Sequence, residues 1–255
     1  MYENIDDLYN ESYHDFYKTC EYKELISSDP IPCKIDNSLK FVGKYNDGII
    51  TLRKPLFNTS DEIRELTSTL YHEFTHYYDE SVFKHLGYQD DDIETLMLTY
   101  SEIHAAYNGI FMFFNLKNLS IKKRIDLNRI KIKNRSIVEY IAFQIAKEIN
   151  SMNNILGLKN AMYLLGEKRA FLKIAKDISA INRAYNFKRI PEVIRNEIIN
   201  IDRLVDLTSY ENIEVKQINL NKLKIENELC RISIKNIPFP NIEGMDEIKQ
   251  IIDNL

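Results

Sequence analysis

The stretch YHEFTHYYDE, residues 71–80, has the order H-E-x-x-H, with His72, Glu73 and His76 at its fixed positions. Residues four apart lie one above the other on one face of an α-helix, so both imidazoles can reach a single metal ion while Glu73 stands beside it. Zinc binds neutral imidazole readily, and a catalytic zinc site keeps one position for water. The stretch therefore predicts a helix that carries two zinc ligands and a general base.

The residues around this motif support a helix whose histidine face is open to another segment. Thr59 and Glu62 form a capping-box pattern, which predicts a helix start at Ser60 or Asp61. At about 100° per residue, one apolar stripe faces the core, and both histidines fall opposite it. The stripe consists of Ile63, Leu66, Leu70, Phe74 and Tyr77, and the histidine face has the small residues Ser68, Thr69 and Thr75. This placement favours a metal site over core histidines or a simple solvent-facing pair.

A third ligand is expected from the segment that follows. The candidates are His85, Asp90, Asp91, Asp92, Glu94, Glu102 and His104. A second helix is predicted from Asp92 to Asn115, with an apolar stripe that includes His104, which we interpret as a packed or cleft-edge histidine. Glu102 falls on the opposite face, beside the small residues Thr95, Thr99, Ala106 and Gly109. Glu102 is therefore the best candidate, because two helices can cross closely at such a face.

With Glu102 in this place, the sequence resembles the gluzincins, the thermolysin-like zinc peptidases. The segment S-E-I-H-A-A, residues 101–106, stands where that group has N-E-x-x-S-D, and only its Glu matches. The final Asp of that pattern supports the first zinc-binding His; here the position is Ala106, so the orienting partner must come from elsewhere, with Asp79 as one candidate. A short strand, H-E-F-T-H and a later E-x-x-A also resemble intracellular peptidases of the ImmA and IrrE type. These resemblances cover about residues 45–115.

The resemblance implies a zinc metallopeptidase that hydrolyses a protein or peptide substrate. Zn²⁺ would be held by His72, His76 and Glu102, and Glu73 would act as the general base. In resembling enzymes a Tyr or His also stabilises the anionic transition state, and the candidates here are Tyr100, Tyr107, His85 and His104. The alternative is a non-catalytic binding or regulatory module that retains a zincin scaffold.

The rest of the chain predicts an α+β, predominantly helical fold with a zincin-like core. Residues 1–116 form this core, with a small N-terminal sheet in which Asn46-Asp47-Gly48 turns a hairpin within residues 40–53. A basic connector follows at 117–135. Residues 136–205 form a helical subdomain with breaks near Asn154, Gly166 and 186–191, and residues 206–255 are an extension with a short β-element.

Composition and charge limit the classes of partner. The formal net charge of -4 argues against a protein that coats nucleic acid or anionic membrane, so neither is expected as a partner. The connector 117–135 has eight Lys or Arg residues and one Asp, and it is a candidate docking strip for an acidic protein. No signal peptide or membrane-spanning run is evident, which predicts a cytoplasmic or otherwise soluble protein and leaves delivery to another compartment open. The three cysteines are expected to be reduced structural thiols.

Overall fold

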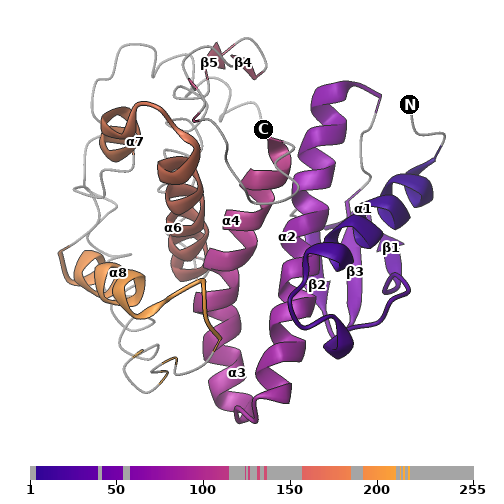
Figure 1. Cartoon of the computed structure of the whole chain (residues 1–255), viewed down its shortest axis with the longest axis horizontal. Helices are drawn as coiled ribbons and strands as arrows, with labels where there is room; N and C mark the ends of the chain where they lie inside the picture. The colour runs from indigo at the N-terminus through magenta and orange to yellow at the C-terminus, as the bar shows by residue number, and fades with distance from the viewer. Residues whose placement is uncertain are drawn as a thin grey trace.

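Three helices pack side by side at the centre of the fold, with α4 between the other two (Figure 1). They are α2 (Ser60–His85), α4 (Glu102–Phe113) and α6 (Gly157–Ile174). The computed structural model describes residues 4–39, 42–53, 58–114, 157–184 and 192–210, and single or paired positions at 124, 126, 131–132, 135–136, 213, 215 and 218. The small sheet and the N-terminal helix lie on the far side of α2 from α4. The fold is mixed α and β with mostly helical content, as predicted.

The motif helix α2 begins as its sequence predicts. The Thr59 hydroxyl accepts from the Glu62 amide at 3.2 Å, and the Glu62 carboxylate accepts from the Thr59 amide at 3.0 Å. This reciprocal capping box satisfies two amides that the first turn leaves without partners. The helix then runs without interruption through the motif, so His72, Glu73 and His76 are fixed on a rigid element.

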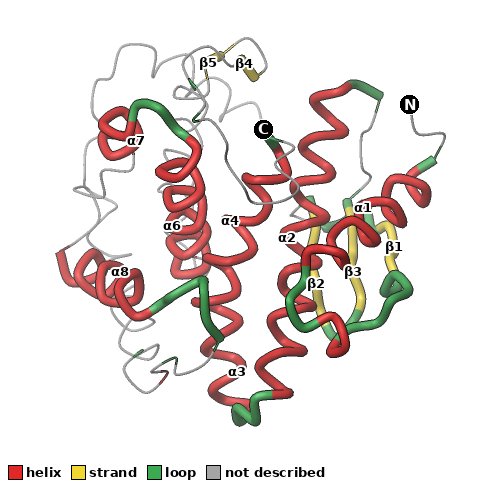
Figure 2. The backbone as a smooth tube through the Cα atoms, viewed as in Figure 1, coloured by secondary structure: helices red, strands yellow, loops and turns green. Residues whose placement is uncertain are grey.

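The sheet has three strands in the order β1-β3-β2 (Figure 2). Strands β2 (Gly43–Asn46) and β3 (Ile49–Leu52) form the predicted antiparallel hairpin. Asp47 and Gly48 both have positive φ, 48° and 76°, which is the geometry of a type I′ turn. Strand β1 (Cys33–Ile35), which we did not predict, pairs in parallel with β3. The strand β2 therefore lies at an edge of the sheet, next to α2.

Helix α1 (Ile5–Thr19) packs on the core face of α2 and was not predicted. Its side chains Tyr9, Tyr13 and Phe16 surround Phe74, with ring centroids 5.2–5.5 Å from the Phe74 ring. Phe74 is completely buried, and the edge-to-face contacts from Tyr9 and Tyr13 add to the stability that burial of the ring provides. The apolar stripe of α2 therefore faces the core, as its spacing indicated. A short 3-10 turn, η1 (Lys23–Leu25), follows α1.

The second predicted helix is present but differs in two ways. It begins earlier, as α3 (Asp90–Leu96), and passes through a π-helical turn, η2 (Met97–Ser101), before α4. The small-residue face is buried as well as the apolar stripe, since Thr99, Glu102 and Ala106 are all buried. Helix α4 is covered by α2 on one side and by α6 on the other, and the second of these neighbours was not predicted.

The predicted helix break near Gly166 is wrong, since α6 continues through this residue. A Cβ on Gly166 would lie 2.2 Å from the Ile103 carbonyl oxygen and 2.7 Å from the Ala106 Cβ. Gly166 is therefore required for close approach of α6 to α4, not for a turn. Helices α7 (Ile178–Ala184) and α8 (Glu192–Leu204) follow.

Parts of the predicted organisation lie outside the described residues. These are most of the basic connector 117–135, the break near Asn154, the turn 186–191 and nearly all of the C-terminal extension with its β-element. Two short strands, β4 (Lys131–Ile132) and β5 (Arg135–Ser136), pair antiparallel.

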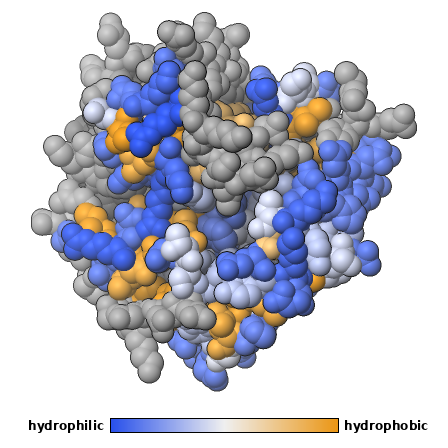
Figure 3. Space-filling model, viewed as in Figure 1, coloured by the Kyte–Doolittle hydropathy of each residue, from blue (hydrophilic) through white to orange (hydrophobic). Residues whose placement is uncertain are grey.

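Among the helices described, none combines the length and the apolar character needed to span a bilayer. The face in Figure 3 is largely hydrophilic over α1, with hydrophobic patches over α7 and α8, where Ile178 and Ile199 are exposed.

Candidate metal centre

Three side chains from two helices converge at the crossing of α2 and α4. The Nε2 atoms of His72 and His76 are 3.1 Å apart, and the Glu102 carboxylate oxygens lie 3.2 Å from the His76 Nε2 and 3.7 Å from the His72 Nε2. Ligands of a tetrahedral zinc ion with bonds of about 2.0–2.1 Å are separated by about 3.3 Å. The three side chains therefore have the spacing of a zinc ligand set.

Glu102 fits the position of the third ligand better than Glu73 does. The side chains of His72, Glu73 and His76 also form a group whose ligand atoms lie within 4.8 Å of one another. One oxygen of each carboxylate is already bound, the Glu73 Oε2 by the Tyr45 backbone amide at 2.7 Å and the Glu102 Oε1 by the Lys159 ammonium at 2.6 Å. Glu102 is 2 % exposed, and its Oε2 is buried without a hydrogen-bond partner. A buried carboxylate oxygen without a partner is costly unless something binds it, and a metal ion satisfies this requirement.

Small residues allow the two helices to cross closely enough for this arrangement. A Cβ on Gly109 would lie 3.1 Å from the Ser68 carbonyl oxygen and 3.7 Å from the His72 Cβ. The Ser68 hydroxyl donates to the Gly109 carbonyl at 2.8 Å, which links the helices one turn from the histidines. The predicted close crossing is thus confirmed at Ser68 and Gly109, whereas Thr69 lies against Gly43 of β2 and Ala106 against Gly166 of α6.

The π turn η2 supplies the residue that orients His76. Ser101, its last residue, places its hydroxyl 2.8 Å from the His76 Nδ1, which leaves Nε2 directed at Glu102. A hydrogen bond on the distal nitrogen fixes the orientation of a metal-binding imidazole. The suggestion that Asp79 orients His72 is wrong, because the Asp79 carboxylate binds His104 and Tyr210. π turns often occur at functional sites, and this one directly precedes Glu102.

Burial and charge set the protonation of the ligands. Burial, with a smaller contribution from His76, lowers the pKa of His72 to about 3, so this imidazole is neutral. Burial alone would lower the pKa of His76, but the Glu102 carboxylate outweighs it and raises this pKa. For Glu102, burial favours the neutral acid, yet His76 and Lys159 outweigh it and hold its pKa well below the usual range. The site therefore offers an ionised carboxylate and one neutral imidazole without further change.

No family model, curated protein or solved structure matches this chain. The resemblance to the gluzincins therefore rests on the motif residues alone.

Glu73 lies beside the ligands and against the edge strand of the sheet. The hairpin register makes Asn46 and Ile49 a hydrogen-bonded pair, so the Tyr45 amide points away from β3, and it donates to the Glu73 Oε2. Gly43 leaves space here, because a Cβ on it would lie 3.1 Å from the Glu73 Oε1 and 2.7 Å from the Thr69 Cγ2. Burial raises the pKa of Glu73, which suits a proton acceptor better than an ordinary exposed carboxylate.

Helix α6 contributes two residues that sequence reasoning missed. The Lys159 ammonium lies 2.6 Å from the Glu102 Oε1, and the Tyr163 ring is centred 5.5 Å from the His72 ring. These residues are four apart and share one face of α6. Only the spacing K-x-x-x-Y could have pointed to them, and that spacing is common on helices, so the fold was needed to place them at the site.

The four candidate transition-state residues do not gather around the ligands. His85 is exposed at the end of α2, and the buried Tyr100 packs its ring against Phe83 and Tyr210. Tyr107 stacks on Phe111. His104 is held by Asp79 at 2.9 Å, which agrees with its interpretation as a packed or cleft-edge histidine. Lys159 and Tyr163, by contrast, contact the ligand side chains Glu102 and His72.

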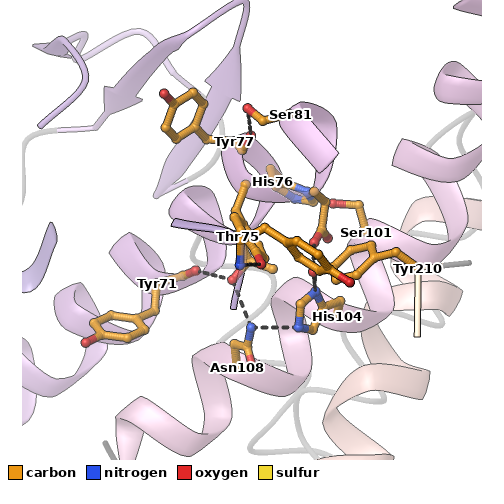
Figure 4. A network of polar contacts seen from close by, with 12 residues as sticks. Tyr71, Thr75, His76, Tyr77, Ser81, Ser101, His104, Asn108 and Tyr210 are labelled. Atoms are coloured by element: carbon orange, nitrogen blue, oxygen red, sulfur yellow. Dashed lines mark hydrogen bonds and ion pairs between the residues drawn. The ribbon is translucent and has the colours of Figure 1, made fainter. Parts of the chain in front are cut away.

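A second polar network fixes the chain after α8 to the two ligand helices (Figure 4). The Tyr210 hydroxyl donates to the buried Asp79 carboxylate at 2.8 Å, and this carboxylate also binds the His104 Nδ1. Asn108 then links the His104 Nε2, at 3.0 Å, to the Thr75 hydroxyl, at 3.1 Å. Because Asp79 and His104 lie close in sequence to His76 and Glu102, this network holds the helix crossing in register.

The cysteines that the structure describes take no part in the site. Cys20 and Cys33 are both free thiols. Cys20 is buried, and burial raises its pKa to about 12, so it is protonated near neutral pH and a poor nucleophile, as expected of a structural thiol. Cys33 lies at an exposed position of β1.

Proposed function

We propose that this protein is a zinc-dependent metallopeptidase with a gluzincin-like ligand set. The observation that carries the proposal is the convergence of three side chains beside a buried glutamate. The His72 and His76 Nε2 atoms are 3.1 Å apart, the Glu102 Oε1 lies 3.2 Å from the His76 Nε2, and the Glu102 Oε2 lies 3.7 Å from the His72 Nε2. A purely structural zinc site needs four protein ligands and no general base. Three ligands and Glu73 are the composition of a hydrolytic site.

The chain's own residues divide the reaction between them. Bound zinc would activate a water molecule and polarise the scissile carbonyl. Glu73 would take the proton from that water on Oε1, because the Tyr45 amide occupies Oε2, and would then pass it to the leaving amine. The buried position of Glu73, 5 % exposed, keeps its carboxylate away from competing water.

The edge strand β2 provides the means to hold a peptide. Its outward amide at Tyr45 lies within hydrogen-bond distance of the general base, so a substrate strand added along this edge would pass the ligands. Main-chain hydrogen bonds of this kind bind extended chains with little demand on their side chains. The proposal therefore predicts extended peptide segments, rather than helices, as substrates.

The test compares Glu73→Gln with Glu94→Gln, an exposed glutamate in α3. We expect Glu73→Gln to retain zinc and to lose turnover of a mixed peptide library by about 10²–10⁴-fold, and Glu94→Gln to match the wild type in both. Zinc binding without any cleavage by the wild-type protein would instead favour the non-catalytic binding module. Equal turnover by wild type and Glu73→Gln would overturn the assigned role of this residue.

A further inference from the structure

Lys159 places a positive charge on a carboxylate that the proposed function assigns to zinc. Its side chain is 42 % exposed, but its ammonium reaches inward to the Glu102 Oε1, a distance of 2.6 Å. The other oxygen, Oε2, is buried, has no hydrogen-bond partner and lies 3.7 Å from the His72 Nε2. The two oxygens of Glu102 therefore differ: Oε1 binds the ammonium and also lies 3.2 Å from the His76 Nε2, whereas Oε2 has no hydrogen-bond partner.

This difference determines how Glu102 can act as a ligand. A charge-assisted hydrogen bond on Oε1 fixes the plane of the carboxylate and presents Oε2 toward His72, whereas Oε1 itself lies 3.2 Å from the His76 Nε2. The hydrogen bond also withdraws negative charge from the ligand. Two neutral imidazoles and one carboxylate would leave a bound zinc site with a net charge of about +1, and the Lys159 ammonium, one carboxylate away, raises this to about +2.

We propose that Lys159 is a positioning residue of Glu102 and a resident cation that weakens metal binding. This inference rests on the proposed zinc site. Without metal, the ammonium neutralises the buried Glu102 carboxylate and so stabilises the fold. With metal, the same ammonium repels the dication. The protein thus remains folded in the metal-free state and holds its zinc less tightly than the three ligands alone would hold it.

The packing of α6 against α4 holds Lys159 beside Glu102. Gly166, two turns after Lys159, allows α6 to lie directly against Ile103 and Ala106, next to Glu102. A helix held this closely at its middle keeps its first turn beside the site. Tyr163 lies between the two positions and covers the His72 ring from the same face.

The test measures zinc affinity, by competition with a chromophoric chelator, and thermal stability of the metal-free protein for three chains: wild type, Lys159→Met and Lys159→Arg. For Lys159→Met we expect zinc to bind about tenfold more tightly or better, since repulsion between the ammonium and the dication is removed. We expect its metal-free form to unfold at a lower temperature, because Glu102 loses its buried partner. Lys159→Arg keeps the charge and should resemble the wild type in both measurements.

The opposite signs of the two effects separate this role from simple packing. If Lys159 only supported the fold, Lys159→Met would lower both the stability and the zinc affinity, and that result would overturn the proposal. Unchanged zinc affinity in Lys159→Met would overturn it as well. Absence of zinc binding in all three chains would refute the zinc site itself, which distinguishes failure of the proposed function from failure of the role of Lys159.

Discussion

Gly166→Ala should destabilise the protein, although alanine is the better helix former. The added Cβ would lie 2.2 Å from the Ile103 carbonyl oxygen, which is backbone and cannot rotate away, and 2.7 Å from the Ala106 Cβ. Overpacking costs about 1–3 kcal/mol, and the contact with rigid backbone places this site in the upper part of that range, at about 2–3 kcal/mol. The gain in helix propensity offsets about 1 kcal/mol. We therefore expect a net loss of about 1–2 kcal/mol in the free energy of unfolding.

Thermal and denaturant unfolding of the metal-free protein measure this loss. For a chain of this length, 1 kcal/mol corresponds to about 2–4 °C in Tm, so Gly166→Ala should unfold about 2–8 °C below the wild type. Lys173→Ala, at an exposed position of the same helix, controls for the change in propensity and should stay within about 0.5 kcal/mol. A Gly166→Ala protein as stable as the wild type, or more stable, would show that α6 does not lie this close to α4.

Three further predictions address the site and its support. Ser101→Ala removes the hydrogen bond on the His76 Nδ1 and should weaken zinc binding by about 10–100-fold. Ser81→Ala, which loses only a hydrogen bond to a backbone carbonyl, should leave zinc affinity unchanged. Equal zinc affinities of the two variants would contradict the role of Ser101 in orienting His76. Tyr210→Phe removes the donor to the buried Asp79 and should lower the free energy of unfolding by about 1.5–3 kcal/mol in urea, and a change within error would show that the network is not needed. Zinc binds unprotonated imidazole, and the Glu102 carboxylate raises the pKa of His76, so zinc affinity should increase with pH until His76 has lost its proton. A zinc affinity that does not depend on pH below neutrality would contradict the assignment of His76 as a ligand.

The local signals in the sequence were sufficient for the elements that carry the motif. The capping box at Thr59 and Glu62, the turn at Asp47-Gly48 and the apolar stripe of α2 each depend on neighbouring residues, and each is confirmed. The same holds for the small residues at the crossing of α2 and α4. A helical pattern and a close-packing face are properties of one segment, so one segment can reveal them.

The features that the sequence did not reveal depend on partners far along the chain. Lys159 and Tyr163 come to the site only because α6 packs on α4, and the π turn before Glu102 has no propensity signal of its own. Gly166 shows the ambiguity clearly, since a glycine in a helical pattern is compatible with a break and with close approach of two helices. The packing of α6 against α4 likewise could not be predicted from the pattern of α4 itself.

The charges of the site follow a simple arrangement. One buried carboxylate, Glu102, is shared by an imidazole on α2 and an ammonium on α6, so three helices meet at a single charged group. Removal of either partner leaves the carboxylate less well compensated in a buried position, which is costly. The same residue thus links the stability of the metal-free fold to the capacity to hold a metal.

The most direct test of the account is the zinc content of purified protein, determined by elemental analysis after zinc is supplied and excess removed. The wild type, Glu102→Gln and His85→Ala are compared, because His85 was also a candidate ligand but lies exposed at the end of α2. We predict about one zinc per chain for the wild type and His85→Ala, and loss of zinc for Glu102→Gln. No zinc in the wild type, or full occupancy in Glu102→Gln, would contradict the proposed centre.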